Sequence, residues 1–214
     1  MNSSRARPAR PIKAPETLRS EAFWAQPRYD DGAWLENYYM SASGEWRDVL
    51  MRALAPLAPF PSVCELGCHC GPNLKRLRET FGECYYYVGV DVNASALAFG
   101  RLMAQAAGYP DDSVVWLHRS LLDLVVDEQP LFDLALTSSC LAVIPPADIA
   151  RAVHTCLSLS RRVVAIQEPN FDTKNGEFQQ WRHDYDSLVL QARGGSSFRW
   201  ARPGDGTVLV GVRH

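Results

Sequence analysis

Short apolar runs alternate with amphipathic segments along most of the chain after residue 60. Each apolar run has the length of a buried strand, and each following segment spaces its apolar residues as a helix does. Ile149, Val153 and Leu157, for example, recur on one face of the predicted helix 146–160. The pattern predicts a doubly wound α/β fold with helices on both faces of a mostly parallel sheet. The predicted strands are 62–67, 85–92, 113–120, 132–139 and 161–169.

The last forty residues or so follow a different pattern. A helix is predicted over 177–193, and two strand-like runs follow at 196–203 and 207–214. The turn sequence PGDG joins these runs so tightly that they should form an antiparallel hairpin at the edge of the sheet. Together with the five earlier strands, the hairpin predicts a seven-stranded sheet whose last strand is antiparallel.

The segment before the first strand divides into two parts. Residues 1–20 are basic and rich in proline at their start, which is typical of a disordered tail. Residues 21–58 combine helical spacing with many aromatic side chains, and we expect them to form a helical cap over the open end of the sheet. Residues 59–214 are predicted to form the main domain.

Composition narrows the function classes. The 214 residues are 47% hydrophobic and 21% charged, with a formal net charge of −2. A nucleic-acid partner is disfavoured because a strongly basic face is lacking, and no apolar run has the length of a membrane span. Six cysteines without an export signal indicate reduced thiols in a cytoplasmic protein. Homodimer formation stays open.

The stretch VCELGCHCGP, residues 63–72, follows the first predicted strand. Ligands of doubly wound sheets bind at the carboxyl ends of strands, so this loop is where a ligand is expected. A dinucleotide site would want glycine at 67, 69 and 72, but His69 and Pro72 stand at two of these positions. No metal is expected, because the neighbouring cysteines have no second CxxC-type pair to complete a tetrahedral site.

The loop and the strands after it resemble the class I S-adenosylmethionine-dependent methyltransferases. Glu65, Gly67 and Gly71 match the acidic residue and glycines of the family's first motif, whereas His69 replaces its middle glycine. Cys68 matches a small residue that often follows the first glycine. The resemblance implies that these residues bind the donor S-adenosylmethionine, together with Asn73 near the start of the next helix.

The resemblance extends to the later strands. It implies that Asp91, with its neighbour Val92, accepts the ribose hydroxyls at the end of the second strand. Ser120 and Leu121 stand where the family often has Gly-Asp beside the adenine, and Asp123 is a weak substitute for that acid. Further donor contacts are expected from Ser138 at the end of the fourth strand and from Tyr29 and Tyr38 in the cap.

Methyl transfer requires alignment of donor and acceptor, and a general base only where the acceptor must lose a proton. Glu168 after the fifth strand and His183 in the following helix are the candidates. The leading hypothesis is an enzyme that methylates a small molecule, a metabolite or natural-product intermediate. The alternatives are methylation of protein or RNA, and a donor-binding partner subunit without catalysis, which His69 and the missing adenine-side acid would favour.

Overall fold

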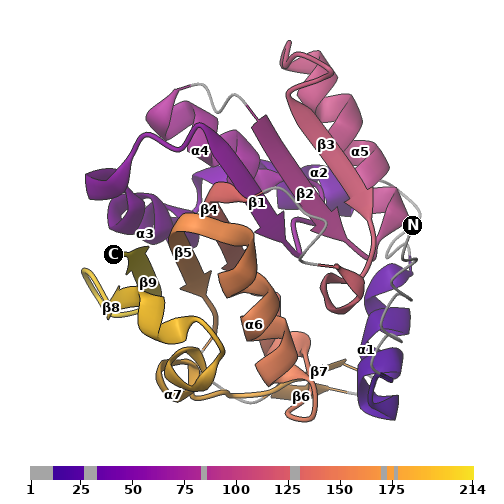
Figure 1. Ribbon diagram of the computed structural model, residues 1–214. Helices are drawn as coiled ribbons and strands as arrows, with labels where there is room; N and C mark the ends of the chain where they lie inside the picture. Colours follow the sequence, from indigo (N-terminus) through magenta and orange to yellow (C-terminus); the bar gives the residue numbers. More distant parts are fainter. Residues whose placement is uncertain (1–11, 27–32, 83–85, 126–130, 170–172, 176–177) are drawn as a thin grey trace, which may run out of the picture.

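The computed structural model describes residues 12–26, 33–82, 86–125, 131–169, 173–175 and 178–214 (Figure 1). Three helices precede the first strand: α1 (Pro15–Ala25), α2 (Ala33–Met40) and α3 (Glu45–Leu54). The helical cap therefore begins earlier than predicted, because α1 starts within the segment expected to be a disordered tail. Pro15 occupies the first turn of α1, where its missing N–H costs no helical hydrogen bond.

The central sheet has seven strands in the order β3-β2-β1-β4-β5-β9-β8. Strands β1 to β5 pair in parallel, and β9 runs antiparallel between β5 and β8. The predicted doubly wound sheet with an antiparallel last strand is thus confirmed. The strands are β1 (Ser62–Leu66), β2 (Tyr86–Asp91), β3 (Val114–His118), β4 (Phe132–Ser138), β5 (Ser160–Gln167), β8 (Phe198–Ala201) and β9 (Val208–Arg213).

Apolar helix faces cover both sides of the sheet, as the sequence predicts (Figure 1). Successive strand residues point to opposite faces, so Cys64 and Leu66 enter one core while Val63 enters the other. The helices α6 (Ile149–Leu159) and α7 (Tyr185–Gln191) pack into the core that contains Cys64. The opposite core is covered by α3, α4 (Pro72–Phe81) and α5 (Ala94–Ala106).

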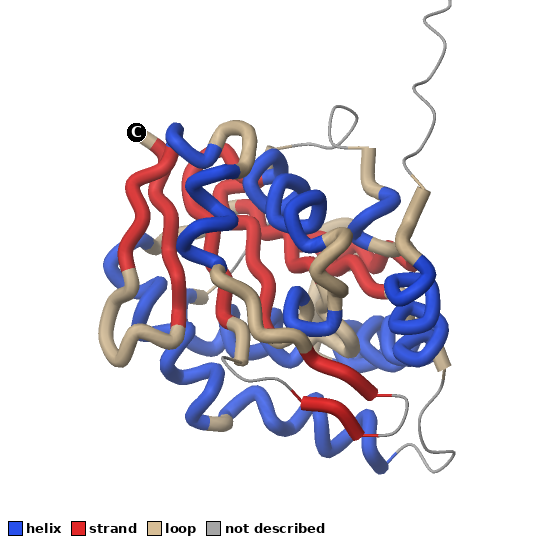
Figure 2. Tube along the Cα trace, turned by 90° about the horizontal axis from the view of Figure 1, so that it is seen from below, coloured by secondary structure: helices blue, strands red, loops and turns tan. Residues whose placement is uncertain are grey.

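The helix predicted over 177–193 is wrong in its first half. Strands β6 (Thr173–Asn175) and β7 (Phe178–Gln180) form a separate antiparallel pair, and α7 begins only at Tyr185. Figure 2 shows this hairpin apart from the main sheet. Asp184 caps α7 by accepting a hydrogen bond from the Ser187 N–H. None of the described helices combines the length and apolar character that a membrane crossing needs.

Candidate functional site

A cavity of about 370 Å³ lies at the carboxyl ends of β1, β2 and β4. The three N-terminal helices contribute much of its wall, so the cap closes over the end of the sheet. Open α/β sheets bind ligands at this position, where crossovers leave the central strands in opposite directions. The helices supply Ser20, Glu21, Trp24, Trp34, Tyr38, Trp46 and Arg47 to the cavity wall.

The loop after β1 turns through three residues with positive φ. Gly67 has φ +75° and Gly71 has φ +80°, values that glycine adopts without steric cost. A Cβ on Gly67 would lie 2.3 Å from Cys140 Sγ, so a close approach of two chain segments also requires glycine there. His69, between them, adopts φ +49° and so accepts the conformation of the glycine it replaces.

Glu65 and Asn73 shape this loop from beneath the cavity. The Asn73 side-chain amide donates to Glu65 Oε1 over 2.7 Å, and the Tyr87 hydroxyl donates to Oε2. Burial raises the pKa of Glu65 to about 7, against the effect of these two hydrogen bonds. Cys68 is buried in the sheet packing below. The structure therefore does not bring Glu65, Cys68, Gly71 or Asn73 to the cavity wall, although each helps to form the turn.

Asp91 lines the cavity at the end of β2. Its Oδ2 accepts the His69 N–H at 2.8 Å, and its Oδ1 accepts the Asn93 N–H at 2.8 Å. Burial raises the pKa of Asp91, and the hydrogen bonds from these backbone amides oppose that effect. Each carboxylate oxygen has a second lone pair, so the group can still accept two hydroxyl donors. Val92, also predicted, lines the cavity beside it.

The imidazole of His69 packs against two aromatic rings of α2. Its ring centroid lies 4.9 Å from that of Trp34 and 4.6 Å from that of Tyr38. Burial, helped by the charge of Arg47, lowers the pKa of His69 to about 4, so the ring is neutral at pH 7. Its buried Nε2 has no hydrogen-bond partner among the described residues. The predicted Tyr38 lines the cavity, and burial raises its pKa to about 12.

Arg47 is a cavity residue that sequence reasoning missed. Its side chain is buried, its Nη1 donates to the Ser41 carbonyl at 3.0 Å, and its Nε has no partner in the described part of the chain. The guanidinium also lies 5.3 Å from the centroid of the Tyr38 ring. A signal was present, because Arg47 shares the apolar face of α3 with Leu50 and Leu54. A charged residue on a buried helical face usually has a buried partner or ligand.

Ser120 and Leu121, two of the predicted donor contacts, follow β3 and line the cavity. The Ser120 hydroxyl donates to Oε1 of Glu21, a residue of α1, and accepts the Leu122 N–H at 3.1 Å. Glu21 was not predicted as a site residue. No local pattern in α1 indicates that this carboxylate reaches the end of a strand some hundred residues later.

Ser138, another predicted donor contact, lines the cavity at the end of β4. Its hydroxyl accepts the Trp46 indole N–H at 3.1 Å and donates to Gln167 Oε1 at 3.0 Å. The Gln167 amide in turn donates to the Trp46 carbonyl. These contacts fasten α3 to the ends of β4 and β5. They also position Trp46, another cavity residue that the sequence did not single out.

Glu168, a predicted catalytic residue, is buried behind the cavity wall rather than on it. Its Oε1 accepts the Thr137 hydroxyl and the Cys140 and Leu141 N–H groups, and its Oε2 accepts the Ala142 N–H, all at 3.0–3.1 Å. Burial raises its pKa to about 7 despite these hydrogen bonds. The geometry makes Glu168 the anchor of the turn after β4, whose Ser139, Cys140 and Val143 line the cavity.

His183 does not line the cavity either. Its Nε2 lies 2.9 Å from the carbonyl oxygen of Ile144, and its ring packs edge-on against Tyr185. These contacts tie the segment before α7 to the turn after β4. Tyr29 lies outside the described residues. Within the described residues, no group of three or more His, Cys, Asp or Glu side chains is arranged to hold a metal ion.

Comparisons with solved structures bear on the fold. Magnesium protoporphyrin IX methyltransferase from Synechocystis PCC 6803, solved with bound SAM, matches 94% of this chain and 93% of its own, with a TM-score of 0.60 and 15% identity. A Burkholderia thailandensis 1,6-didemethyltoxoflavin-N1-methyltransferase matches 95% and 92%, with a TM-score of 0.61 and 19% identity. The sugar N-methyltransferase KedS8 from Streptoalloteichus sp ATCC 53650 matches 84% and 92%, with a TM-score of 0.62 and 14% identity.

At these identities the likeness shows a shared fold. The chain has no significant match among curated proteins. Residues 63–162, which run from β1 through α6 to the start of β5, match the family described as a methyltransferase domain. The sheet order, the reversed β9 and this match agree with the motifs read from the sequence. The chain therefore carries a match to a methyltransferase domain over residues 63–162, and as a whole it has the fold of the solved S-adenosylmethionine-dependent methyltransferases.

Proposed function

We propose that the protein methylates a small molecule, and that the cavity under the N-terminal helices holds both donor and acceptor. The observation that carries this proposal is the cavity covered by α1, α2 and α3. Its volume of about 370 Å³ lies within the size range of small-molecule sites. Three tryptophans and Tyr38 line it, and such flat apolar side chains suit a compact, partly apolar acceptor. An extended protein or RNA chain would need a more open surface.

The cavity wall carries polar groups that fit the parts of S-adenosylmethionine. Asp91 offers acceptors for the ribose hydroxyls. Arg47 and His69, which also line the cavity, present buried nitrogens that have no partner among the described residues. We assign the Arg47 guanidinium to the α-carboxylate of the donor, because charge-assisted pairing would satisfy its unpartnered Nε. The loop at Gly67 allows the donor to approach the backbone closely.

The sulfonium donor supplies an activated methyl group, so the chain needs mainly to align the acceptor and exclude water. The roof of α1, α2 and α3 supplies that exclusion. Both carboxylate oxygens of Glu168 are engaged by protein donors behind the wall, so we assign this residue a positioning role rather than that of a general base. His183 has the same kind of role through its contact with Ile144.

The structural neighbours named above act, as their names say, on a porphyrin, a sugar and didemethyltoxoflavin, and this range supports a small-molecule acceptor for the present chain. The thiols of Cys64, Cys68, Cys70, Cys140 and Cys156 are free, which supports a reducing, cytoplasmic setting. Methylation of protein or RNA is the second candidate function. The observation that favours it is the basic character of residues 1–20, which lie mostly outside the described part of the chain.

Two measurements test the proposal. Isothermal titration calorimetry with S-adenosylmethionine and S-adenosylhomocysteine should show binding of both, and binding of neither would refute it. Release of S-adenosylhomocysteine should then occur with members of a panel of small amines, phenols, sugars and carboxylic acids. Turnover with RNA or protein fractions alone would favour the second candidate. Donor binding without turnover on any panel would favour a non-catalytic partner subunit.

A further inference from the structure

Within the described residues, two carboxylates line the cavity: Asp91 from β2 and Glu21 from α1. They belong to different layers of the molecule but lie near the ends of two neighbouring strands, β2 and β3. The Arg119 N–H donates to the Asp91 carbonyl at 2.9 Å, which places the end of β3 beside Asp91. Ser120, the next residue, donates its hydroxyl to Glu21. The Glu21 carboxylate thus lies one strand away from the proposed ribose site.

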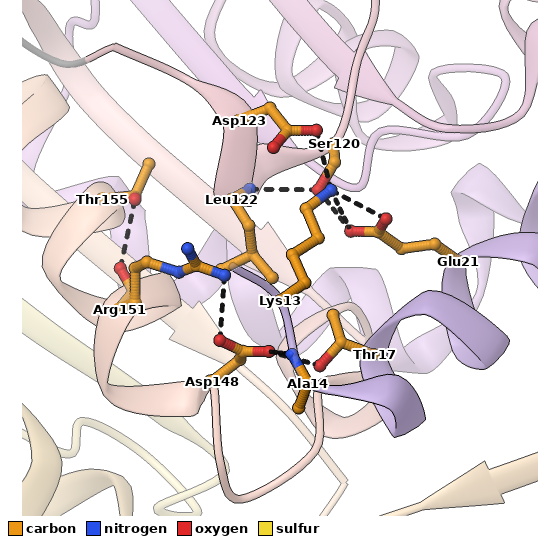
Figure 3. Close-up of polar contacts among 10 residues, drawn as sticks. All are labelled: Lys13, Ala14, Thr17, Glu21, Ser120, Leu122, Asp123, Asp148, Arg151 and Thr155. Atoms are coloured by element: carbon orange, nitrogen blue, oxygen red, sulfur yellow. Dashed lines mark hydrogen bonds and ion pairs between the residues drawn. The ribbon is translucent and has the colours of Figure 1, made fainter. Parts of the chain in front are cut away.

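A network of polar contacts fixes Glu21 in this position (Figure 3). Lys13 Nζ lies 3.0 and 2.8 Å from the two carboxylate oxygens of Glu21 and 2.7 Å from Asp123 Oδ2. At the start of α1, Asp148 Oδ2 accepts the Ala14 N–H and the Thr17 hydroxyl. The helix is therefore anchored at its first turn and again at Glu21. Lys13 also compensates the charge of a carboxylate whose side chain is only 19% exposed.

The network leaves Glu21 one free acceptor position. A carboxylate has about four lone-pair sites. Oε1 accepts both Lys13 and Ser120, whereas Oε2 accepts Lys13 alone among the described residues. One lone pair of Oε2 is therefore available to a donor in the cavity. The Ser120 hydroxyl has a single proton and donates it to Glu21, while its oxygen accepts the Leu122 N–H, so Ser120 has no proton to offer a ligand.

The proposed donor has a group that matches this acceptor. With the ribose at Asp91 and the amino-acid end near Arg47, the adenine ring extends toward the end of β3. Val92 and Leu121 provide apolar surface there for a flat ring. The exocyclic amino group of adenine is a hydrogen-bond donor. The end of β3 itself offers this group no side-chain carboxylate as an acceptor, because Ser120 and Leu121 line the cavity there.

We infer that Glu21 accepts the exocyclic amino group of the donor adenine, so that α1 supplies the base-reading carboxylate that the β3 loop lacks. The inference rests on the proposed function, since it requires an adenosyl donor in this cavity. It makes α1 a part of the donor site and a determinant of donor specificity. The N-terminal helix is then needed for donor selection as well as for closing the cavity.

The test compares S-adenosylhomocysteine with S-inosylhomocysteine, in which a keto oxygen replaces the amino group. Calorimetry on the full chain should show the wild type binding the adenosyl compound at least tenfold more tightly, because a carboxylate repels the keto oxygen. Glu21→Gln should reduce that preference about tenfold or more, since an amide can donate to the keto group. Glu16→Gln is the matched control and should keep the wild-type preference, because Glu16 lies on the same helix but pairs at the surface with Arg19 alone among the described residues.

Glu21→Asp is the second variant and guards against misfolding of the first. Aspartate keeps the charge but places it one methylene further from the cavity. The preference for the adenosyl compound should therefore fall, while the circular dichroism spectrum should match that of the wild type. A preference unchanged in both Glu21 variants would overturn the inference, and so would a wild type that does not distinguish the two ligands. Failure of the wild type to bind either ligand would instead count against the proposed function.

Discussion

The backbone N–H of His69 donates a 2.8 Å hydrogen bond to Asp91 Oδ2 and thereby joins the loop after β1 to the end of β2. His69 makes this hydrogen bond while its backbone has φ +49°. The Asn93 N–H holds the other oxygen. Two loops thus fix one carboxylate, and the position of the proposed ribose site follows from backbone geometry.

Replacing Asp91 should remove most of the donor affinity. We expect Asp91→Ala to weaken S-adenosylhomocysteine binding about 10- to 100-fold, because hydrogen bonds to a charged group contribute about 1.5–3 kcal/mol. The affinity of Asp91→Asn should lie between those of the wild type and Asp91→Ala, since asparagine keeps the shape of the side chain and one acceptor oxygen. Titration calorimetry measures these constants. Wild-type affinity in Asp91→Ala would show that the ribose lies elsewhere.

Replacing His69 separates the cost of its backbone conformation from the contribution of its ring. His69→Ala and His69→Gly both lose the contacts with Trp34 and Tyr38, but only glycine adopts φ +49° freely. The glycine variant should therefore be more stable to urea than the alanine variant by about 1 kcal/mol. Equal unfolding free energies would mean that the loop relaxes to another conformation when the ring is removed.

The sequence predicted the sheet and the strand ends better than it predicted how the three N-terminal helices cover the cavity. Gly67, Asp91, Ser120 and Ser138 could be placed at the cavity from the sequence because strand ends and turns have local signatures in residue type and order. Glu168 was predicted as a cavity residue and lies behind the wall instead, because a carboxylate after a strand looks the same in sequence whether it faces a cavity or the amides of a neighbouring turn.

Two charged residues of the N-terminal helices escaped prediction for a different reason. Arg47 and Glu21 reach the cavity only through the way in which their helices pack, and that packing joins segments far apart in the chain. The error at 177–193 has a related cause. The hairpin β6–β7 follows from tertiary contacts, among them the hydrogen bond from the Trp181 N–H to the Ala142 carbonyl at 2.7 Å, which overrule local helix propensity.

Replacing Arg47 should weaken ligands that carry a carboxylate and spare those that lack it. We expect Arg47→Met to reduce affinity for S-adenosylhomocysteine about 10- to 100-fold, as loss of a charge-assisted hydrogen bond implies. Affinity for 5′-methylthioadenosine, which lacks the amino-acid part, should change by less than about twofold. The same loss for both ligands would show that Arg47 acts by packing against Tyr38 and Ser41 rather than by binding the donor.

Glu168 should make stability depend on pH in a defined direction. Its pKa rises from 4.5 to about 7 on folding, so the folded protein keeps a proton that the unfolded chain has lost. The contribution of Glu168 to stability is therefore greatest below pH 4.5 and decreases as the pH rises to about 7, by at most about 3 kcal/mol. The side-chain amide of Glu168→Gln does not titrate, so residue 168 makes no pH-dependent contribution to the stability of this variant.

The informative quantity is the difference in unfolding free energy between the wild type and Glu168→Gln, because Glu65 and His69 titrate in both proteins. At pH 5 the wild type should be more stable, since the amide nitrogen of the variant has to face a backbone N–H, which costs about 1–3 kcal/mol. Urea unfolding at pH 5, 6, 7 and 8 should show this advantage shrinking with pH and levelling off above pH 7. An advantage that is constant, or that grows with pH, would mean that the turn from Cys140 to Ala142 keeps Glu168 ionised throughout.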